Sequence, residues 1–172
     1  MEINETYEYI LEELQKGHRP RVSLENEDID LVIKELENRH NIQKNLCIIC
    51  HLRTPTPSLH AALLTLLDLP QEQLQELTPF IMESFTRHFI EYQHQFGEAV
   101  PAIFLKKLAE FTKACPKEQL IYPLSVIESL GGRSIYFKSI IGQIDWGLRS
   151  IFSRQQREAI EIIKRIEKFW PN

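Results

Sequence analysis

Two stretches of the chain repeat one pattern, and this self-similarity constrains the fold more than any single motif. "PQEQLQELTPFIMESF" begins at Pro70 and "PKEQLIYPLSVIESL" begins at Pro116. Both open with Pro-x-Glu-Gln-Leu, contain an internal proline, and close with Glu-Ser and an apolar residue. Upstream, Glu27 stands 45 residues before Glu72 in a similar pattern. The spacing predicts helix-pair repeats of about 45 residues from residue 26 onward.

Apolar residues recur every three or four positions, which predicts helices throughout and no sheet. The clearest stripe runs from Leu74 to Phe96 and indicates one long helix with a single buried face. The same test predicts helices over 4–16, 27–39, 42–52, 58–67, 71–95, 101–113, 117–130, 134–152 and 154–169. Short connections between them favour antiparallel neighbours. We therefore expect an all-α fold of antiparallel helix pairs in a right-handed stack, a short α-solenoid. An irregular helical bundle is the alternative.

At the repeated residues the sequence resembles HEAT and armadillo repeat proteins. The resemblance rests on the period, on the helix pairing, and on Pro79 and Pro123, which lie inside helices as kinking prolines do in such units. It covers residues 26–170, but the Asp and Arg positions typical of HEAT units are not evident. The resemblance implies an extended concave surface for binding another protein.

Length and composition indicate one folded domain spanning residues 1–172. Hydrophobic residues make up 43% of the chain and charged residues 26%, which is typical of globular proteins. No apolar run approaches the roughly 20 residues that span a bilayer, so no membrane contact is expected. Acidic residues near Met1 argue against a signal peptide, and three cysteines argue against a disulfide framework. A cytoplasmic location follows as an expectation.

Charge is unevenly distributed along the chain. The net charge is −4 overall, but it is −6 over residues 1–40, −2 over 41–130 and +4 over 131–172. An acidic protein is a poor general binder of nucleic acid, because such binding depends on summed phosphate neutralisation. Only the last forty residues could supply a basic patch.

One motif suggests chemistry. Cys47, Cys50 and His51 have the C-x-x-C-H spacing of covalent haem attachment. The haem interpretation requires an export route that the sequence does not indicate, and a thioredoxin-like redox pair requires a βαβ context that is absent. Zinc would require four ligands, for which Cys47, Cys50, His51 and His60 are the nearest set. On a helix, Cys50 falls beside the apolar face and His51 on the opposite side, so the sequence favours structural cysteines. No cofactor is expected.

The last predicted helix carries the candidate binding face. Its isoleucines, Ile160, Ile163 and Ile166, and then Trp170 can face the core. Basic residues then remain outside, and with one aromatic residue upstream they form the candidate partner-binding set: Arg154, Arg157, Lys164, Lys168 and Trp146.

These observations favour a non-catalytic module that binds another, acidic protein, and a bacterial immunity or adaptor role suits its size. No phosphate-binding or nucleophile motif is present. One alternative is a nucleic-acid-binding protein that uses the basic carboxyl-terminal helices, although the net charge and the lack of interleaved aromatic residues disfavour it. A second alternative is a metal-binding protein centred on Cys47 and Cys50.

Overall fold

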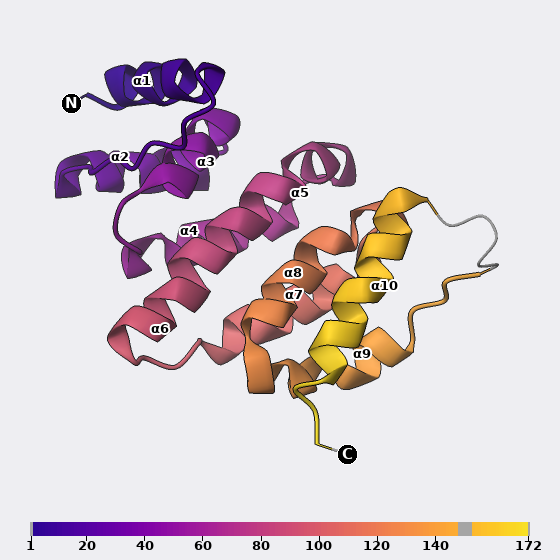
Figure 1. Cartoon of the computed structure of the whole chain (residues 1–172). Coiled ribbons are helices and arrows are strands. Elements are labelled where there is room, and N and C mark those ends of the chain that lie inside the picture. The colour runs from indigo at the N-terminus through magenta and orange to yellow at the C-terminus, as the bar shows by residue number, and fades with distance from the viewer. Residues whose placement is uncertain (1, 148–152, 172) are drawn as a thin grey trace. The chain divides into compact units, whose positions relative to one another are not determined.

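The protein is all-α in the computed structural model, which describes residues 2–147 and 153–171 (Figure 1). Within those ranges the chain forms helices and no strand, apart from an isolated parallel bridge between Val22 and Leu52. The chain divides into two compact units, residues 1–97 and 98–172. The all-α class expected from the apolar periodicity is confirmed, while the α-solenoid stacking and the single domain stay predictions.

The amino-terminal unit is built around α3 (Ile42–His51). Two helices, α1 (Ile3–Gln15) and α2 (Asn26–Glu37), pack on α3, and α5 (Gln71–Phe85) packs against it as well. Short helical turns link α3 to α5: η1 (Pro57–Leu59), α4 (His60–Thr65) and η2 (Leu66–Asp68). The α3 stretch 45–50 is buried on every side. A helix of this kind needs apolar residues all round, which the letters LCIIC supply.

The long helix predicted over 71–95 is continuous but not uniform. It runs as α5, a π-helical turn η3 (Thr86–Glu91) and α6 (Tyr92–Phe96), and it ends at Gly97 in the left-handed conformation. A π turn widens the helix by one residue per turn. In this turn the consecutive residues Arg87 and His88 both reach back to the segment 49–56.

The carboxyl end of α3 is held by side chains from elsewhere in the unit. The carbonyl of Cys50 accepts from Arg21 Nη1 at 3.1 Å, and that of Leu52 accepts from Arg87 Nε at 3.0 Å. His88 Nε2 donates to the carbonyl of Ile49 at 3.0 Å. Because the last carbonyls of a helix lack partners within the helix, these bonds fix the end of α3 against α5 and η3.

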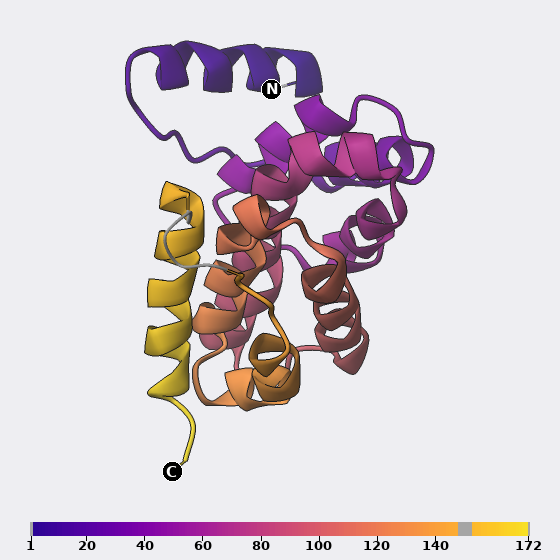
Figure 2. The ribbon, with the colours of Figure 1, turned by 90° about the vertical axis from the view of Figure 1, so that its right-hand side faces the viewer.

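The carboxyl-terminal unit centres on α8 (Ile121–Ser129). It is preceded by α7 (Ala102–Ala114) and the 3-10 turn η4 (Lys117–Gln119), and followed by the 3-10 helix η5 (Gly131–Phe137) and α9 (Lys138–Gly142). The last helix, α10 (Arg154–Glu167), lies alongside α8 in both views (Figures 1 and 2). A capping box starts α10: Ser153 Oγ accepts from the Gln156 N–H, and Gln156 Oε1 accepts from the Ser153 N–H.

The two copies of the sequence repeat occupy the centres of the two units. The first copy forms α5 and the second forms η4 and α8, with Pro79 and Pro123 inside helices. Leu74 and Leu120, which match in the alignment, are both buried. The burial expected at both positions is confirmed, while the identity of the repeat as a HEAT or armadillo unit stays a prediction.

One helix prediction is wrong in part. The continuous helix expected over 134–152 is instead the 3-10 helix η5 and the five-residue α9, and residues 144–147 are not helical. The rest of the predicted range, 148–152, lies outside the described residues. Gly142 ends α9, and Asp145 Oδ1 accepts from the Gly147 N–H at 2.9 Å in a turn. This local bond competes with a helix.

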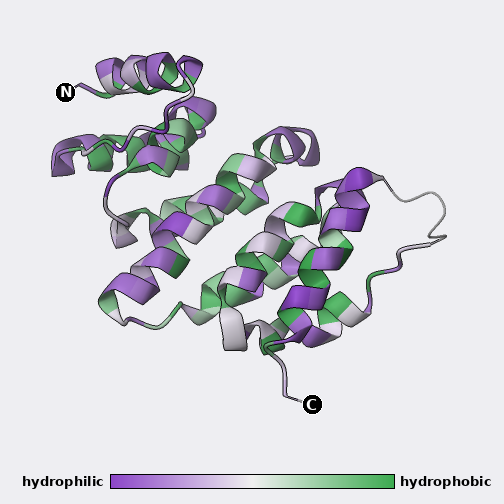
Figure 3. Ribbon diagram, viewed as in Figure 1, coloured by the Kyte–Doolittle hydropathy of each residue, from purple (hydrophilic) through white to green (hydrophobic). Residues whose placement is uncertain are grey.

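Along α10, hydrophilic and hydrophobic residues recur in turn, as the hydropathy colouring in Figure 3 shows. This recurrence is expected of a helix with one apolar face. None of the helices in the described ranges is long and apolar enough to cross a membrane.

Candidate functional site

The cysteines of the C-x-x-C-H motif are packed inside the amino-terminal unit. Cys50 is buried, and its thiol lies 3.4 Å from the carbonyl of Phe80 and 3.2 Å from Ser84 Oγ. Burial raises the pKa of the Cys50 thiol to about 12. Burial also raises the pKa of the Cys47 thiol. Neither thiol is a ready nucleophile, because the thiolate is the reactive form.

The two histidines of the candidate metal set bind backbone carbonyls. His51 is half-buried, where the sequence indicated full exposure, and its Nδ1 donates to the carbonyl of Cys47 at 2.8 Å. His60 Nε2 donates to the carbonyl of His88 at 2.6 Å, and its ring stacks on Phe89. Within the described ranges, no three His, Cys, Asp or Glu side chains are placed to hold a metal ion. Of the motif residues, Cys50 joins α3 to α5 through its contacts with Phe80 and Ser84.

The helix α10 has one face fixed and one face open. Four apolar side chains are buried against the unit: Ala159, Ile162, Ile163 and Ile166. Arg165 anchors the edge of this face through a two-point contact with Glu128, with Nε–Oε1 at 2.6 Å and Nη2–Oε2 at 3.1 Å. The four cations of the candidate set, Arg154, Arg157, Lys164 and Lys168, are exposed as expected.

The exposed face of α10 is less basic than the candidate set suggests. Glu158, Glu161 and Glu167 are exposed on the same helix, and Lys164 Nζ pairs with Glu161 Oε1 at 2.7 Å. An exposed pair of this kind adds little stability, but it largely cancels the field of Lys164 at a distance. Arg154 and Arg157, in the first turn of α10, form no ion pair within the described ranges.

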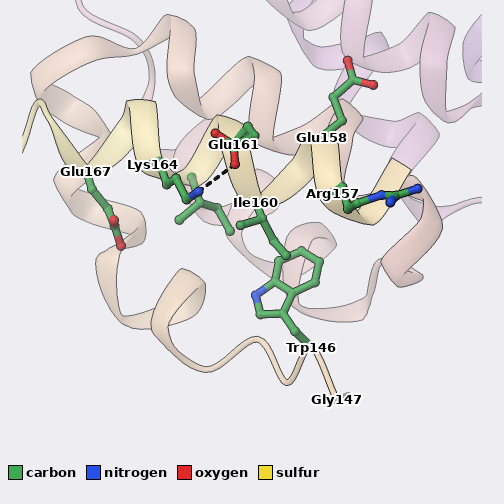
Figure 4. A pocket seen from close by; sticks show the side chains of 9 residues that line it. Trp146, Gly147, Arg157, Glu158, Ile160, Glu161, Lys164 and Glu167 are labelled. Atoms are coloured by element: carbon green, nitrogen blue, oxygen red, sulfur yellow. Dashed lines mark hydrogen bonds and ion pairs between the residues drawn. The ribbon is translucent and has the colours of Figure 1, made fainter. Parts of the chain in front are cut away.

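A groove of about 620 Å³ runs between α10 and residues 146–147. Figure 4 shows the indole of Trp146 and the side chain of Ile160 pointing toward each other along it. Arg157 lies toward one end of the groove and Glu167 toward the other. Ile160 was expected in the core, but it is half-buried and forms an apolar wall of the groove. Ile162 is buried in the core instead, because α10 is rotated about its own axis by part of a turn from the predicted orientation.

Charge also differs between the two units. Residues 1–97 hold sixteen acidic and eight basic residues, a net charge of −8, whereas residues 98–172 hold eight and twelve, a net charge of +4. The unit that contains α10 is therefore positive although the whole chain is negative. The net charge of the whole chain hides this difference.

Comparison with known proteins gives no relative: no family model matches the chain, and neither a curated protein nor a solved structure is similar to it.

Sequence reasoning missed two kinds of exposed apolar residue in the carboxyl-terminal unit. Ile160 lines the groove, and Ile135, Tyr136 and Phe169 are exposed on the surface. Their periodicity fits a buried stripe as well as a surface, so the sequence held no signal that distinguishes the two.

Proposed function

We propose that the protein is a non-catalytic interaction module that holds a protein partner along the open face of α10. The observation that carries this proposal is the groove, in which half-buried Ile160 and Trp146 form an apolar wall flanked by charged side chains. Protein interfaces combine an apolar centre with a charged rim in this way. An aromatic residue at the centre is typical of the positions that dominate binding energy.

The partner is expected to place an apolar side chain against Ile160 and an acidic one near Arg157. Among the cations of α10, Lys164 pairs with Glu161 and Arg165 with Glu128, whereas Arg154 and Arg157 form no ion pair within the described ranges. Opposite charges across a rim mainly accelerate association and fix the orientation of the partner. An adaptor of this kind, working in the cytoplasm with reduced cysteines, is the role we propose.

The rigidity of α10 supports this assignment. The capping box at Ser153 fixes the start of α10, and its buried apolar face and the Arg165–Glu128 contact hold it on α8. A preorganised surface avoids the ordering cost that otherwise weakens binding.

The test is an affinity purification from the native host followed by binding measurements on the purified pair. Arg157→Glu with Lys164→Glu should slow association with the captured protein, most strongly at low salt. Ile160→Ser should accelerate dissociation instead, because it removes apolar contact and leaves the charges in place.

The matched control reverses two exposed lysines of α7 in the same unit, Lys106→Glu with Lys113→Glu. This control makes the same change of net charge away from the groove, and it should leave binding unchanged. Equal binding by the wild type and both groove variants would refute the proposal. Equal losses of affinity in the groove and control variants would show that binding depends on the net charge and not on the groove.

A further inference from the structure

A second surface of the carboxyl-terminal unit lies where the end of the chain meets η5. Trp170 Nε1 donates to Ser134 Oγ at 3.0 Å, and Lys138 Nζ lies 5.6 Å from the centre of the Trp170 ring. These contacts bring residues 168–170 next to residues 133–138. We call this surface the carboxyl-terminal corner, and it consists of Arg133, Ile135, Tyr136, Lys138, Lys168, Phe169 and Trp170.

The 3-10 geometry of η5 determines which side chains the corner presents. Residues three apart are eclipsed in such a helix, and Ser134 and Phe137 form its buried row. The two flanking rows are exposed: Arg133 with Tyr136 on one side, and Ile135 with Lys138, at the start of α9, on the other. Each exposed row therefore contains one cation and one apolar side chain.

Two aromatic side chains of the corner are about half exposed. Tyr136 is 53% exposed and Phe169 is 48% exposed. A half-exposed ring keeps one face or edge in contact with the protein, and its other side is available to a planar ligand. The edge-on contact of Tyr136 with Phe137, at 5.2 Å between ring centres, holds the Tyr136 ring in place.

The corner contains three cations and no acidic residue of its own, and the nearest acid along the chain is the exposed Glu167 beside Lys168. Arg133, Lys138 and Lys168 are exposed, and no carboxylate in the described ranges forms an ion pair with any of them. The sequence from Gly131 to Ile144 contains two cations and no acidic residue. On the open face of α10, by contrast, Glu161 pairs with Lys164. The corner is therefore a positive surface with no internal counter-charge.

We propose that the carboxyl-terminal corner binds single-stranded nucleic acid. Phosphates would be held by Arg133, Lys138 and Lys168, and bases would stack on the rings of Tyr136 and Phe169. Proteins that bind single strands without sequence preference combine cations for the backbone with exposed aromatic side chains on which bases stack. An acidic polypeptide would use the cations equally well, but its acidic side chains carry no planar ring that could stack on Tyr136 and Phe169, whereas every base does.

The overall negative charge does not oppose this proposal. The net charge of −4 arises from the amino-terminal unit at −8, while the unit that carries the corner is at +4. Three phosphate contacts correspond to a logarithmic salt slope of about −2 for a single strand. Binding should therefore be detectable at low salt and fall by about 20-fold between about 50 and 200 mM salt.

The experiment is fluorescence anisotropy of the full-length protein with labelled oligo(dT) and oligo(U) of about twelve nucleotides, across a salt series. Arg133→Gln with Lys138→Gln should weaken binding and reduce the slope to about −0.7, the value for the one remaining cation. Tyr136→Ser with Phe169→Ser should weaken binding about tenfold or more and leave the slope unchanged. The control, Lys106→Gln with Lys113→Gln on α7, should bind as the wild type does.

Three outcomes would overturn the proposal: no binding by the wild type at low salt, equal losses in the control and corner variants, or poly-glutamate binding that is as tight and as sensitive to the ring substitutions. The glutamine variant touches only exposed side chains, so its result remains informative even if the serine variant unfolds. Neither variant changes a residue of α10, so the result is independent of the groove beside that helix.

Discussion

The imidazole of His88 accepts a hydrogen bond from the backbone N–H of Thr56 at 2.9 Å. The acceptor is Nδ1, and the other ring nitrogen, Nε2, donates to the carbonyl of Ile49 at 3.0 Å. His88 is fully buried, so both nitrogens are satisfied only in the neutral ring with the proton on Nε2. Burial lowers the pKa of His88 to about 4.

This relationship predicts acid sensitivity. The pKa of His88 lies below its ordinary value of 6.5, so the unfolded chain takes up the proton first as the pH falls. The stability that His88 contributes is therefore complete above pH 6.5 and is lost between pH 6.5 and about 4, for a total of about 3 kcal/mol. Urea unfolding across this range should show the loss.

The variant that tests this linkage is His88→Gln, whose amide can donate to Ile49 and accept from Thr56 without titrating. It should lower stability at pH 7 but flatten the dependence on pH between 6.5 and 4.5. His94→Gln, at an exposed position two turns along, should leave the dependence unchanged. A wild-type profile that is flat in this window would mean that His88 is not buried in the neutral form.

Cys50→Ser should be well tolerated. A serine hydroxyl at this position can donate to the carbonyl of Phe80, which the thiol already approaches, so the expected cost is about 1 kcal/mol or less. A larger loss that added zinc restores would support the metal alternative instead. Thermal melts with and without zinc provide the measurement.

Leu74→Ala and Leu120→Ala should each destabilise the protein by about 2–5 kcal/mol, because both side chains are buried at matching places in the repeat. Leu31→Ala, at a leucine that is 47% exposed on α2, is the control and should change stability by about 0.5 kcal/mol at most. Chemical denaturation of the three variants would measure this. A small effect at either repeat position would argue against the alignment of the two copies.

The fold was more predictable from sequence than the surface. Helical periodicity and stop signals such as Gly97 located the helices to within a few residues, because burying a stripe leaves a regular pattern. The helix expected over 134–152 was wrong at residues 144–147, where the bond between Asp145 and the Gly147 N–H forms a turn. The apolar periodicity of a sequence does not show where a short-range hydrogen bond from a side chain competes with the helix.

The exposure of individual residues was less predictable. Ile160 and Ile162 are both apolar and two positions apart, and only the rotation of α10 on α8 decides that Ile162 is buried and Ile160 lines the groove. The cations of α10 were predicted to be exposed, and they are, but the pairing of Lys164 with Glu161 required side-chain geometry. The uneven charge was visible along the sequence, but the boundary after residue 97 that assigns −8 to one unit and +4 to the other came from the structure.

The hydrogen bond from Trp170 to Ser134 should hold the carboxyl-terminal corner together. Ser134 is fully buried, so loss of the indole donor leaves its hydroxyl oxygen without that bond. Trp170→Phe should therefore cost about 1–3 kcal/mol, the penalty for an unsatisfied buried group together with the lost contact to Lys138. Ser134→Ala removes the acceptor and should cost less, since Trp170 is only half-buried and its indole N–H can turn to water.

A double-mutant cycle separates the bond from the packing. If the hydrogen bond is formed in solution, the double variant should be about 0.5–3 kcal/mol more stable than the sum of the single losses predicts. Trp170→Phe with a substitution at the distant Lys106 is the matched control, and its effects should be additive. Additive losses for Trp170 and Ser134 would show that the two residues do not interact, and the end of the chain would then not be fixed on η5.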